Sequence, residues 1–186
     1  MIFGCQSNSK ELPILSYKID DSGKKHNYLV TYDGFYNQLG ELFATKNIEN
    51  KVFIANFFFT KCPSICPPMR TSLISIAKDF KKKDDFLIVS HTIDPENDSI
   101  EVLQNYSEAT GIPLEKWQFV RSSTENTRQQ ANLFMTNFKP NEDGTDFYHS
   151  SYVALVDKNQ QIRGFYNILV AEEVNRLKID ITSLLK

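Results

Sequence analysis

Residues 51–69 read KVFIANFFFTKCPSICPPM, and this stretch decides the fold. Its first part, residues 52–59, is an almost unbroken apolar and aromatic run, which is typical of a central β-strand covered on both faces. Pro67 and Pro68 follow the second cysteine, and proline is tolerated in the first turn of a helix. Further apolar residues recur at helical spacing, and they are Met69, Leu73, Ile76, Ala77 and Phe80. An amphipathic helix over residues 67–83 is therefore predicted directly after the strand.

The rest of the chain alternates between predicted strands and helices. In chain order the expected elements are a strand over residues 86–93, a helix over 98–111, a strand over 117–120, a helix over 124–135, a hairpin of strands 152–156 and 161–166, and a helix over 171–185. Asp98, with Glu101 three residues later, resembles a capping box at the start of the helix over 98–111. Residues 12–50 hold short apolar stretches broken by turn signals, which favours irregular strands or hairpins.

Alternation of this kind indicates an α/β fold in the thioredoxin-like order. We expect a mostly parallel central sheet flanked by helices, with a C-terminal β-hairpin and helix and extra N-terminal strands. The 186 residues, 41% apolar and 24% charged, suit a single domain, which we place over residues 12–186. Residues 1–11 are expected to be a flexible tether or a signal remnant. The formal net charge of −2 argues against nucleic-acid binding, which needs clustered Lys and Arg.

Cys5 ends the short start Met-Ile-Phe-Gly-Cys and is followed by a polar stretch. This pattern resembles the end of a bacterial lipoprotein signal, whose basic and apolar parts would then lie upstream of these residues. We expect Cys5 to carry a lipid, which would be the only membrane contact. An exposed free cysteine in a disordered tail explains the same residues.

Cys62 and Cys66 lie where the predicted strand passes into the predicted helix. At a helix N-terminus the dipole and the unpaired N–H groups favour thiolate over thiol, and thiolates are nucleophiles and ligands of soft metals. Thioredoxin-type redox motifs have two residues between their cysteines, whereas three separate this pair. The longer spacer allows the two sulfurs to move apart and bind an ion between them. It still permits a disulfide between them. A purely local disulfide and two buried apolar side chains are the structural alternatives.

Of the three histidines, His149 is the candidate third ligand. It follows the polar loop 139–146 and precedes the predicted hairpin, and in a thioredoxin-like sheet that loop returns toward the start of the first helix. A Cys-Cys-His set suits Cu(I) and could hold Cu(II) with added oxygen ligands, whereas a structural zinc site wants four ligands. His26, in the N-terminal region, and His91, within an apolar strand, are expected to be structural or exposed.

Residues 51–67 resemble the core of the Sco/SenC family, copper-handling proteins of cytochrome c oxidase assembly. Three further segments agree in order and spacing: His91-Thr-Ile-Asp94-Pro95, Trp117-Gln-Phe-Val, and His149 followed by a strand and Asp157-Lys-Asn-Gln-Gln-Ile-Arg163-Gly164. The likeness runs from about residue 12 to the C-terminus.

The resemblance implies that Cys62, Cys66 and His149 match the family's copper ligands. It also implies a membrane-tethered protein on the periplasmic or cell-envelope face, in agreement with a lipid on Cys5. Its implied function is that of a metallochaperone, which binds copper and delivers it by ligand exchange to the copper-site subunit of cytochrome c oxidase or to another copper-transfer protein.

An enzyme is the alternative to the chaperone. A thiol-disulfide oxidoreductase would reduce the cysteines of the oxidase copper site, with Cys62 as nucleophile and Cys66 as the resolving residue. A peroxidase is less favoured because Arg70 lies a full turn into the helix. A copper or redox sensor would need a separate receptor, since no effector motif is visible.

Two positions depart from the family pattern, and one is ambiguous. Members often carry Asp before the ligand His and Gly after the following Ser, where this chain has Tyr148 and Ser151. Losing an adjacent anion lowers the electrostatic support for Cu(II). Asp94 matches an acidic position near the family's site, although Pro95 and Asp98 close to it favour a role in a turn before the helix.

Overall fold

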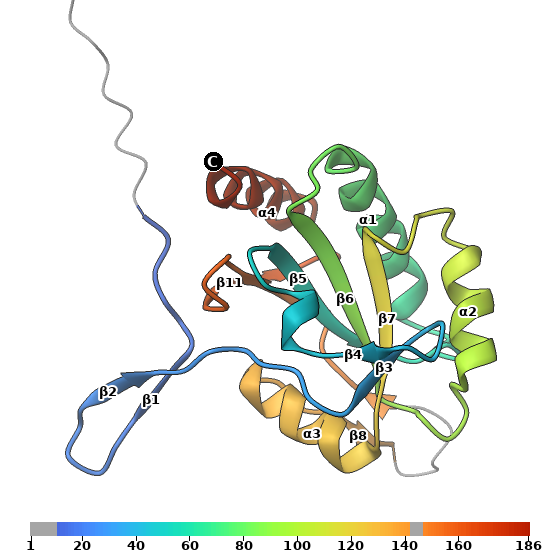
Figure 1. Cartoon of the computed structure of the whole chain (residues 1–186), viewed down its shortest axis with the longest axis horizontal. Coiled ribbons are helices and arrows are strands. Elements are labelled where there is room, and N and C mark those ends of the chain that lie inside the picture. Colours follow the sequence, from blue (N-terminus) through green and yellow to red (C-terminus); the bar gives the residue numbers. More distant parts are fainter. Residues whose placement is uncertain (1–10, 142–146) are drawn as a thin grey trace, which may run out of the picture.

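The computed structural model describes residues 11–141 and 147–186, so Cys5 lies outside the described residues. The main strands are β3 (Phe35–Asn37), β4 (Leu42–Phe43), β5 (Val52–Phe58), β6 (Phe86–Thr92), β7 (Trp117–Arg121), β10 (Tyr152–Val156) and β11 (Ile162–Asn167). The α-helices are α1 (Cys66–Asp79), α2 (Ile100–Glu108), α3 (Thr124–Leu133) and α4 (Ala171–Leu184). The seven strands form one sheet in the order β11-β10-β5-β6-β7-β3-β4 (Figure 1).

Every element predicted beyond residue 50 is present, with its ends moved by a few residues. The thioredoxin-like α/β class is therefore confirmed. The sheet is mixed rather than mostly parallel, because among the described strands only β5, β6 and β7 pair in parallel. β10 and β11 pair antiparallel on one side. On the other side β3 pairs antiparallel with β7, so part of the region before residue 50 extends the central sheet.

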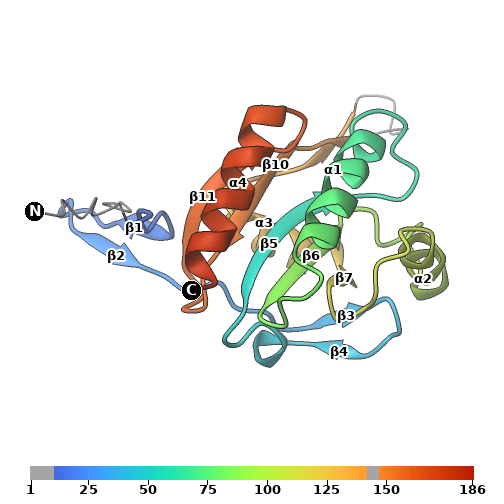
Figure 2. The ribbon, with the colours of Figure 1, turned by 90° about the horizontal axis from the view of Figure 1, so that it is seen from above.

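The helices cover both faces of the sheet. α1 and α4 lie on one face and α3 on the other, with α2 beside the β7 side (Figures 1 and 2). β5 and β6 are buried along their whole length because helices cover them on both sides. Two connections, through α1 and through α2, return to parallel neighbours. The carboxyl ends of β5, β6 and β7 therefore share one edge, where α/β sheets place their sites.

The N-terminal part contributes smaller elements. β1 (Tyr17–Ile19) and β2 (Lys25–Asn27) form a separate hairpin that projects from the body (Figure 2). Arg163 of β11 fastens the chain just before this hairpin, because its guanidinium donates to the carbonyl of Leu12 and pairs with the buried Asp157 at 2.6 Å. A short 3-10 helix follows β4 at Thr45–Asn47, and β8 (Lys139–Pro140) pairs with β9 (Phe147–Tyr148).

The expected capping box at Asp98 is wrong. α2 begins at Ile100, and Ser99 is its N-cap, since the Ser99 hydroxyl accepts from the backbone N–H of Val102 at 3.3 Å. Asp98 is instead fully buried. Serine and aspartate are equally good N-caps, so the pattern of residue types could not say which of the two neighbours turns inward.

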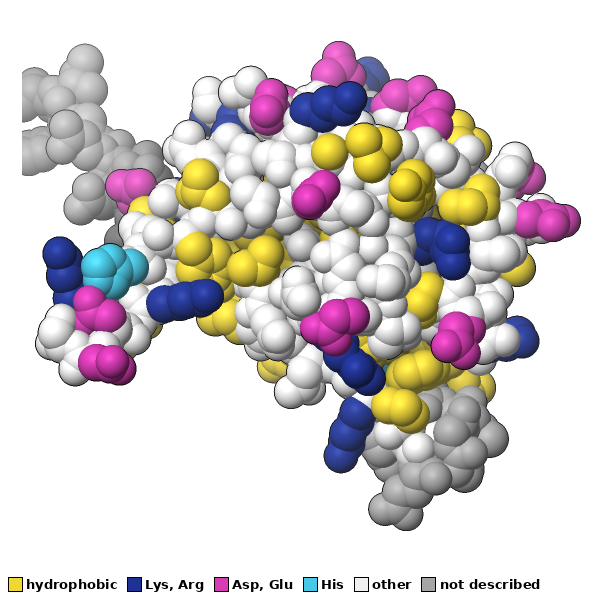
Figure 3. All heavy atoms as spheres, turned by 60° about the horizontal axis from the view of Figure 1, so that its bottom comes forward, with side chains coloured by type: hydrophobic (Ala, Val, Ile, Leu, Met, Phe, Trp, Pro, Cys, Tyr) yellow, Lys and Arg dark blue, Asp and Glu magenta, His cyan; other side chains and the backbone are white. Residues whose placement is uncertain are grey.

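The surface carries charges of both signs. On the face shown in Figure 3, acidic and basic side chains are interspersed rather than gathered by sign, in keeping with the net charge of −2. This face therefore offers no basic patch of the kind that binds phosphate backbones. Among the described residues, no helix combines the length and the apolar character that crossing a bilayer requires.

Candidate metal centre

Cys62 and Cys66 lie at the carboxyl end of β5. Cys66 is the first residue of α1, and Cys62 lies in the loop before it. The backbone N–H of Cys66 donates to the Sγ of Cys62 at 3.4 Å. Pro67 suits the next position, where an N–H would have no partner inside the helix. Both cysteines are buried and their sulfurs are not joined in a disulfide.

His149 comes from a segment that the sheet brings back to the cysteines. β10 pairs antiparallel with β5, with Ala154 opposite Ala55, so the residues just before β10 lie beside the end of β5. The Nε2 atom of His149 is 3.4 Å from the Sγ of Cys66 and 3.7 Å from the Sγ of Cys62. The three donor atoms all lie within 4.8 Å of one another. The structure thus brings together the three residues that the sequence singled out.

The surroundings of Cys62 favour its thiolate. Burial acts to raise the pKa of this thiol, but hydrogen bonds to the sulfur outweigh it and hold the pKa below its ordinary value. The donors are the thiol and backbone N–H of Cys66 and the backbone N–H and hydroxyl of Ser64, whose Oγ is 3.7 Å from the sulfur. A thiolate in this position can act as a ligand or as a nucleophile.

The donor set fits a soft metal ion. Donor atoms bound to one metal at about 2.0–2.3 Å lie roughly 3.3–4 Å apart. The two sulfur–nitrogen separations of 3.4 and 3.7 Å already fall in that range. Two thiolates and an imidazole match Cu(I), while a structural zinc site would need a fourth ligand. Within residues 11–141 and 147–186, no second group of three such ligands occurs.

The other two histidines have structural settings. His91 is fully buried, with its Nδ1 3.0 Å from the carbonyl oxygen of Asn56 and its Nε2 2.9 Å from the hydroxyl of Tyr32. Its ring stacks on Phe57 with centroids 4.6 Å apart. His26 lies in the projecting hairpin and its Nε2 is 2.7 Å from a carboxylate oxygen of Asp20. The prediction of a structural or exposed role therefore agrees with both positions.

Asp94 shapes the turn that follows β6. Its carboxylate accepts two hydrogen bonds from the side-chain amide of Asn97, at 2.9 and 3.0 Å, and its backbone carbonyl accepts from the N–H of Asp98. These contacts are those of a turn residue. Asp94 is not among the three grouped donors.

His91 makes the stability of the fold depend on pH. Burial is the main cause that lowers its pKa from 6.5 to about 4, so the folded protein keeps this imidazole neutral while the unfolded chain takes up a proton. The contribution is fully present above pH 6.5 and is lost as the pH falls toward 4. The shift corresponds to roughly 3 kcal/mol of unfolding free energy. Denaturant unfolding at pH 6.5 and 4.5 should show a steeper loss for wild type than for His91→Asn.

The control for this prediction is His26→Asn, since His26 is exposed in the hairpin. That variant should lose stability between the two pH values as wild type does. Equal losses in the His91→Asn variant and in wild type would contradict the prediction.

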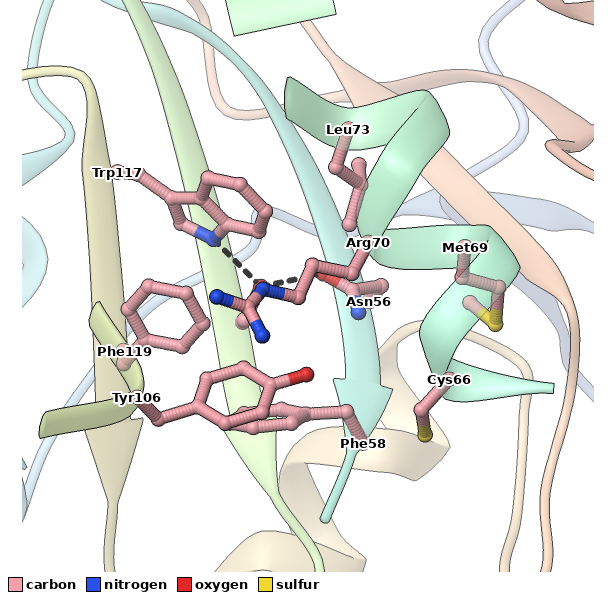
Figure 4. Close-up of a pocket in the computed structure, with 10 residues that line it drawn as sticks. Asn56, Phe58, Cys66, Met69, Arg70, Leu73, Tyr106, Trp117 and Phe119 are labelled. Atoms are coloured by element: carbon pink, nitrogen blue, oxygen red, sulfur yellow. Dashed lines mark hydrogen bonds between the residues drawn. The ribbon is translucent and has the colours of Figure 1, made fainter. Parts of the chain in front are cut away.

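Arg70 is a residue near the site that sequence reasoning undervalued. Arg70 lies one helical turn after Cys66, and both residues line a small cavity. The guanidinium of Arg70 lies over the Tyr106 ring, with its Cζ atom 4.6 Å from the ring centroid. Figure 4 shows Arg70 reaching between the Tyr106 and Trp117 rings, with Cys66 at the rim. The i, i+4 spacing from Cys66 is the signal that could have placed it here.

The cavity is small and has a polar wall. The Trp117 Nε1 atom donates to Ser90 Oγ at 2.8 Å, and Ser90 in turn donates to the side-chain oxygen of Asn56 at 2.6 Å (Figure 4). The Nε of Arg70 is buried and has no hydrogen-bond partner among the described residues. Burial, with an opposing effect of Arg70, raises the pKa of Tyr106 to about 12, so its phenol stays protonated. The free volume is about 10 Å³, which leaves room for one water at most.

Comparison with known proteins identifies the relatives of this chain. A family model described as SCO1/SenC matches residues 23–185. A SCO1/SenC family lipoprotein from Bacillus anthracis has a TM-score of 0.78 at 25% identity, covering 93% of this chain and 98% of that one. BsSco, a member of the Sco family of cytochrome c oxidase assembly proteins in which a disulfide switch was identified, has a TM-score of 0.75 at 24% identity, covering 95% and 99%.

A plant protein shares the same architecture. Arabidopsis thaliana ScoI, solved with copper bound, has a TM-score of 0.70 at 22% identity, covering 85% of this chain and 96% of that one. At such identities the structural likeness establishes the fold. The family model, by contrast, spans most of the sequence. This chain therefore belongs to the SCO1/SenC family and has its thioredoxin-like fold.

Proposed function

We propose that this protein is a copper metallochaperone that takes part in the assembly of cytochrome c oxidase. The observation that carries the proposal is the gathering of two thiol sulfurs and one imidazole nitrogen within 4.8 Å, from Cys62, Cys66 and His149. Such a set has the soft donors that copper prefers. The description of BsSco as an oxidase assembly protein, and of Arabidopsis thaliana ScoI as copper-bound, supports the same function.

Copper is the cargo of this site, and transfer proceeds by ligand exchange. Cys62 and Cys66 hold Cu(I) as two thiolates, and His149 completes a three-coordinate site. As each ligand of the acceptor binds the ion, one of the three ligands of this protein dissociates. The ion therefore passes from one protein to the other without being released into water. The acceptor is the copper-site subunit of cytochrome c oxidase or another copper-transfer protein.

A thiol-disulfide oxidoreductase is the second candidate function. The lowered pKa of Cys62 and the disulfide switch described for BsSco favour it. The Cys62 thiolate would attack a disulfide of the partner, forming a mixed disulfide and releasing one partner thiol. Cys66 would then attack the Cys62 sulfur and release the second thiol. The partner gains two electrons, the Cys62–Cys66 pair becomes a disulfide, and a thiol reductant must restore it.

A transfer experiment separates the two functions. Reduced protein loaded with one equivalent of Cu(I) is mixed with the purified copper-site domain of the host oxidase, once with that domain's cysteines reduced and once with them oxidised. The metal is then measured in each protein after separation. Copper movement to the reduced domain is the chaperone result. Reduction of the oxidised domain by copper-free protein, without any copper transfer, would overturn it in favour of the oxidoreductase.

We further propose attachment to the periplasmic or cell-envelope face of a membrane through a lipid on Cys5. The lipoprotein description of the Bacillus anthracis relative supports this attachment. Mass spectrometry of protein from its native host should find Cys5 acylated. An unmodified Cys5 would contradict the proposal.

A further inference from the structure

Asp98 connects the cysteine loop to the end of the neighbouring strand. One of its carboxylate oxygens accepts from the Thr60 hydroxyl at 2.5 Å, and the other accepts from the Thr60 backbone N–H at 3.2 Å and from the Thr92 hydroxyl at 2.5 Å. Thr60 follows the end of β5 by two residues and precedes Cys62 by two. Thr92 is the last residue of β6. The carboxylate thus ties together two adjacent strand ends and the start of the ligand loop.

The buried position of Asp98 carries a desolvation penalty for a carboxylate. Asp98 is fully buried, and among the ion pairs of the described residues none includes it. Burial raises its pKa, the three hydrogen bonds from Thr60 and Thr92 oppose that rise, and the charge of Asp94 adds to it. An apolar side chain would avoid the desolvation cost, but it would leave the Thr60 N–H and two hydroxyls without this acceptor.

The side chains next to Cys62 in the cysteine loop point to solvent in the part of the chain that the structure describes. Lys61, Pro63 and Ser64 are exposed, and the backbone N–H of Cys62 makes a long bond of 3.3 Å to the carbonyl of Phe59. The bonds from Thr60 to Asp98 therefore anchor the loop two residues before the first sulfur. A displacement of about 1 Å at a ligand is enough to spoil a metal site.

We propose that Asp98 is a positioning residue of the metal centre, which holds Thr60 and through it sets the position of the Cys62 sulfur relative to Cys66 and His149. The proposal rests on the proposed copper site, because it is the geometry of that site that Asp98 would control. Asp98 itself does not touch the ion. Its effect passes through the hydrogen bonds to Thr60.

Threonine variants test this with a matched control. Thr60→Val removes the hydroxyl that binds Asp98, and Thr60→Ser keeps it. Thr45→Val removes another half-buried hydroxyl, which accepts from the Tyr32 N–H at 2.9 Å and lies outside the site. Each purified protein is titrated with Cu(I) against a competing chelator, its Cu(II) absorption and electron paramagnetic resonance spectra are recorded, and its unfolding free energy is measured.

The expected result separates position from stability. Both valine variants should lose stability, but only Thr60→Val should weaken Cu(I) binding, by roughly 10- to 100-fold as for other groups that orient metal ligands, and change the Cu(II) spectra. Thr60→Ser should restore both, and Asp98→Asn, where it folds, should resemble Thr60→Val. Wild-type affinity and spectra in Thr60→Val would overturn the proposal.

A measurement without copper tests the positioning role of Asp98 separately from the proposed copper function. The equilibrium between the Cys62–Cys66 dithiol and its disulfide in glutathione buffers also depends on where the Cys62 sulfur lies. Thr60→Val should shift it relative to wild type, while Thr45→Val should not. If the wild-type protein fails to bind copper, the proposed copper function is contradicted, but the positioning role of Asp98 is not. An unchanged thiol equilibrium in Thr60→Val would then remove the positioning role.

Discussion

Replacing either cysteine of the pair by alanine should abolish tight copper binding. Each thiolate is one of three donors, and four-ligand metal sites in proteins gain about 10–16 kcal/mol, or roughly 3 kcal/mol for each ligand. Cys62→Ala and Cys66→Ala should therefore each lose Cu(I) affinity by about 100-fold or more, and the double variant should bind no copper at stoichiometric concentrations. Chelator competition under anaerobic, reducing conditions measures the change.

Ser64→Ala is the control for the cysteine variants. Ser64 lies in the same loop, exposed and 3.7 Å from the Cys62 sulfur, but it is not one of the grouped donors. Its loss should change copper affinity far less than the loss of a thiolate. Unchanged stoichiometry and affinity in both single cysteine variants would rule out the proposed site.

Loss of the imidazole should separate the two oxidation states of copper. In the His149→Ala variant the two thiolates remain, and two soft donors are sufficient for Cu(I). Cu(II) needs more ligands and accepts nitrogen readily, so its affinity should fall by about 100-fold or more while that for Cu(I) falls much less. The sulfur-to-copper charge-transfer absorption and the nitrogen coupling in electron paramagnetic resonance should change together.

His26→Ala is the matched control for His149→Ala. His26 is exposed in the projecting hairpin and pairs with Asp20, so its loss should leave both copper affinities as in wild type. A His149→Ala variant that keeps the wild-type Cu(II) spectrum and affinity would show that the third ligand is another residue. Equal losses of Cu(I) and Cu(II) affinity would contradict a division of roles between the thiolate sulfurs and the imidazole nitrogen.

Local patterns predicted the elements well where one cause dominates. The buried runs that became β5 and β6 are apolar because helices cover both of their faces, and their short length favours strands over helices. Prediction failed where two residue types could serve the same role. Asp98 and Ser99 are both good caps, and only packing against Thr60 and Thr92 decides that Asp98 turns inward.

Strand pairing was the other weak point. The alternation of strands and helices predicted parallel neighbours correctly for β5, β6 and β7. It could not show that β3, a strand of three residues in an irregular region, would pair with β7 and complete the sheet. Such a pairing depends on contacts between residues far apart in the chain. The local periodicity of the sequence carries no information about these contacts.

The sequence by itself determined the cysteine pair, because a buried strand, two prolines and a helical repeat are all local signals that place Cys62 and Cys66 at a helix N-terminus. It also singled out His149 by its place before the last hairpin. Only the tertiary structure decided that His149 Nε2 lies 3.4 Å from the Cys66 sulfur, across 83 positions of the chain. The physical reason is the antiparallel register of β10 on β5, which returns the chain to the edge where β5 ends.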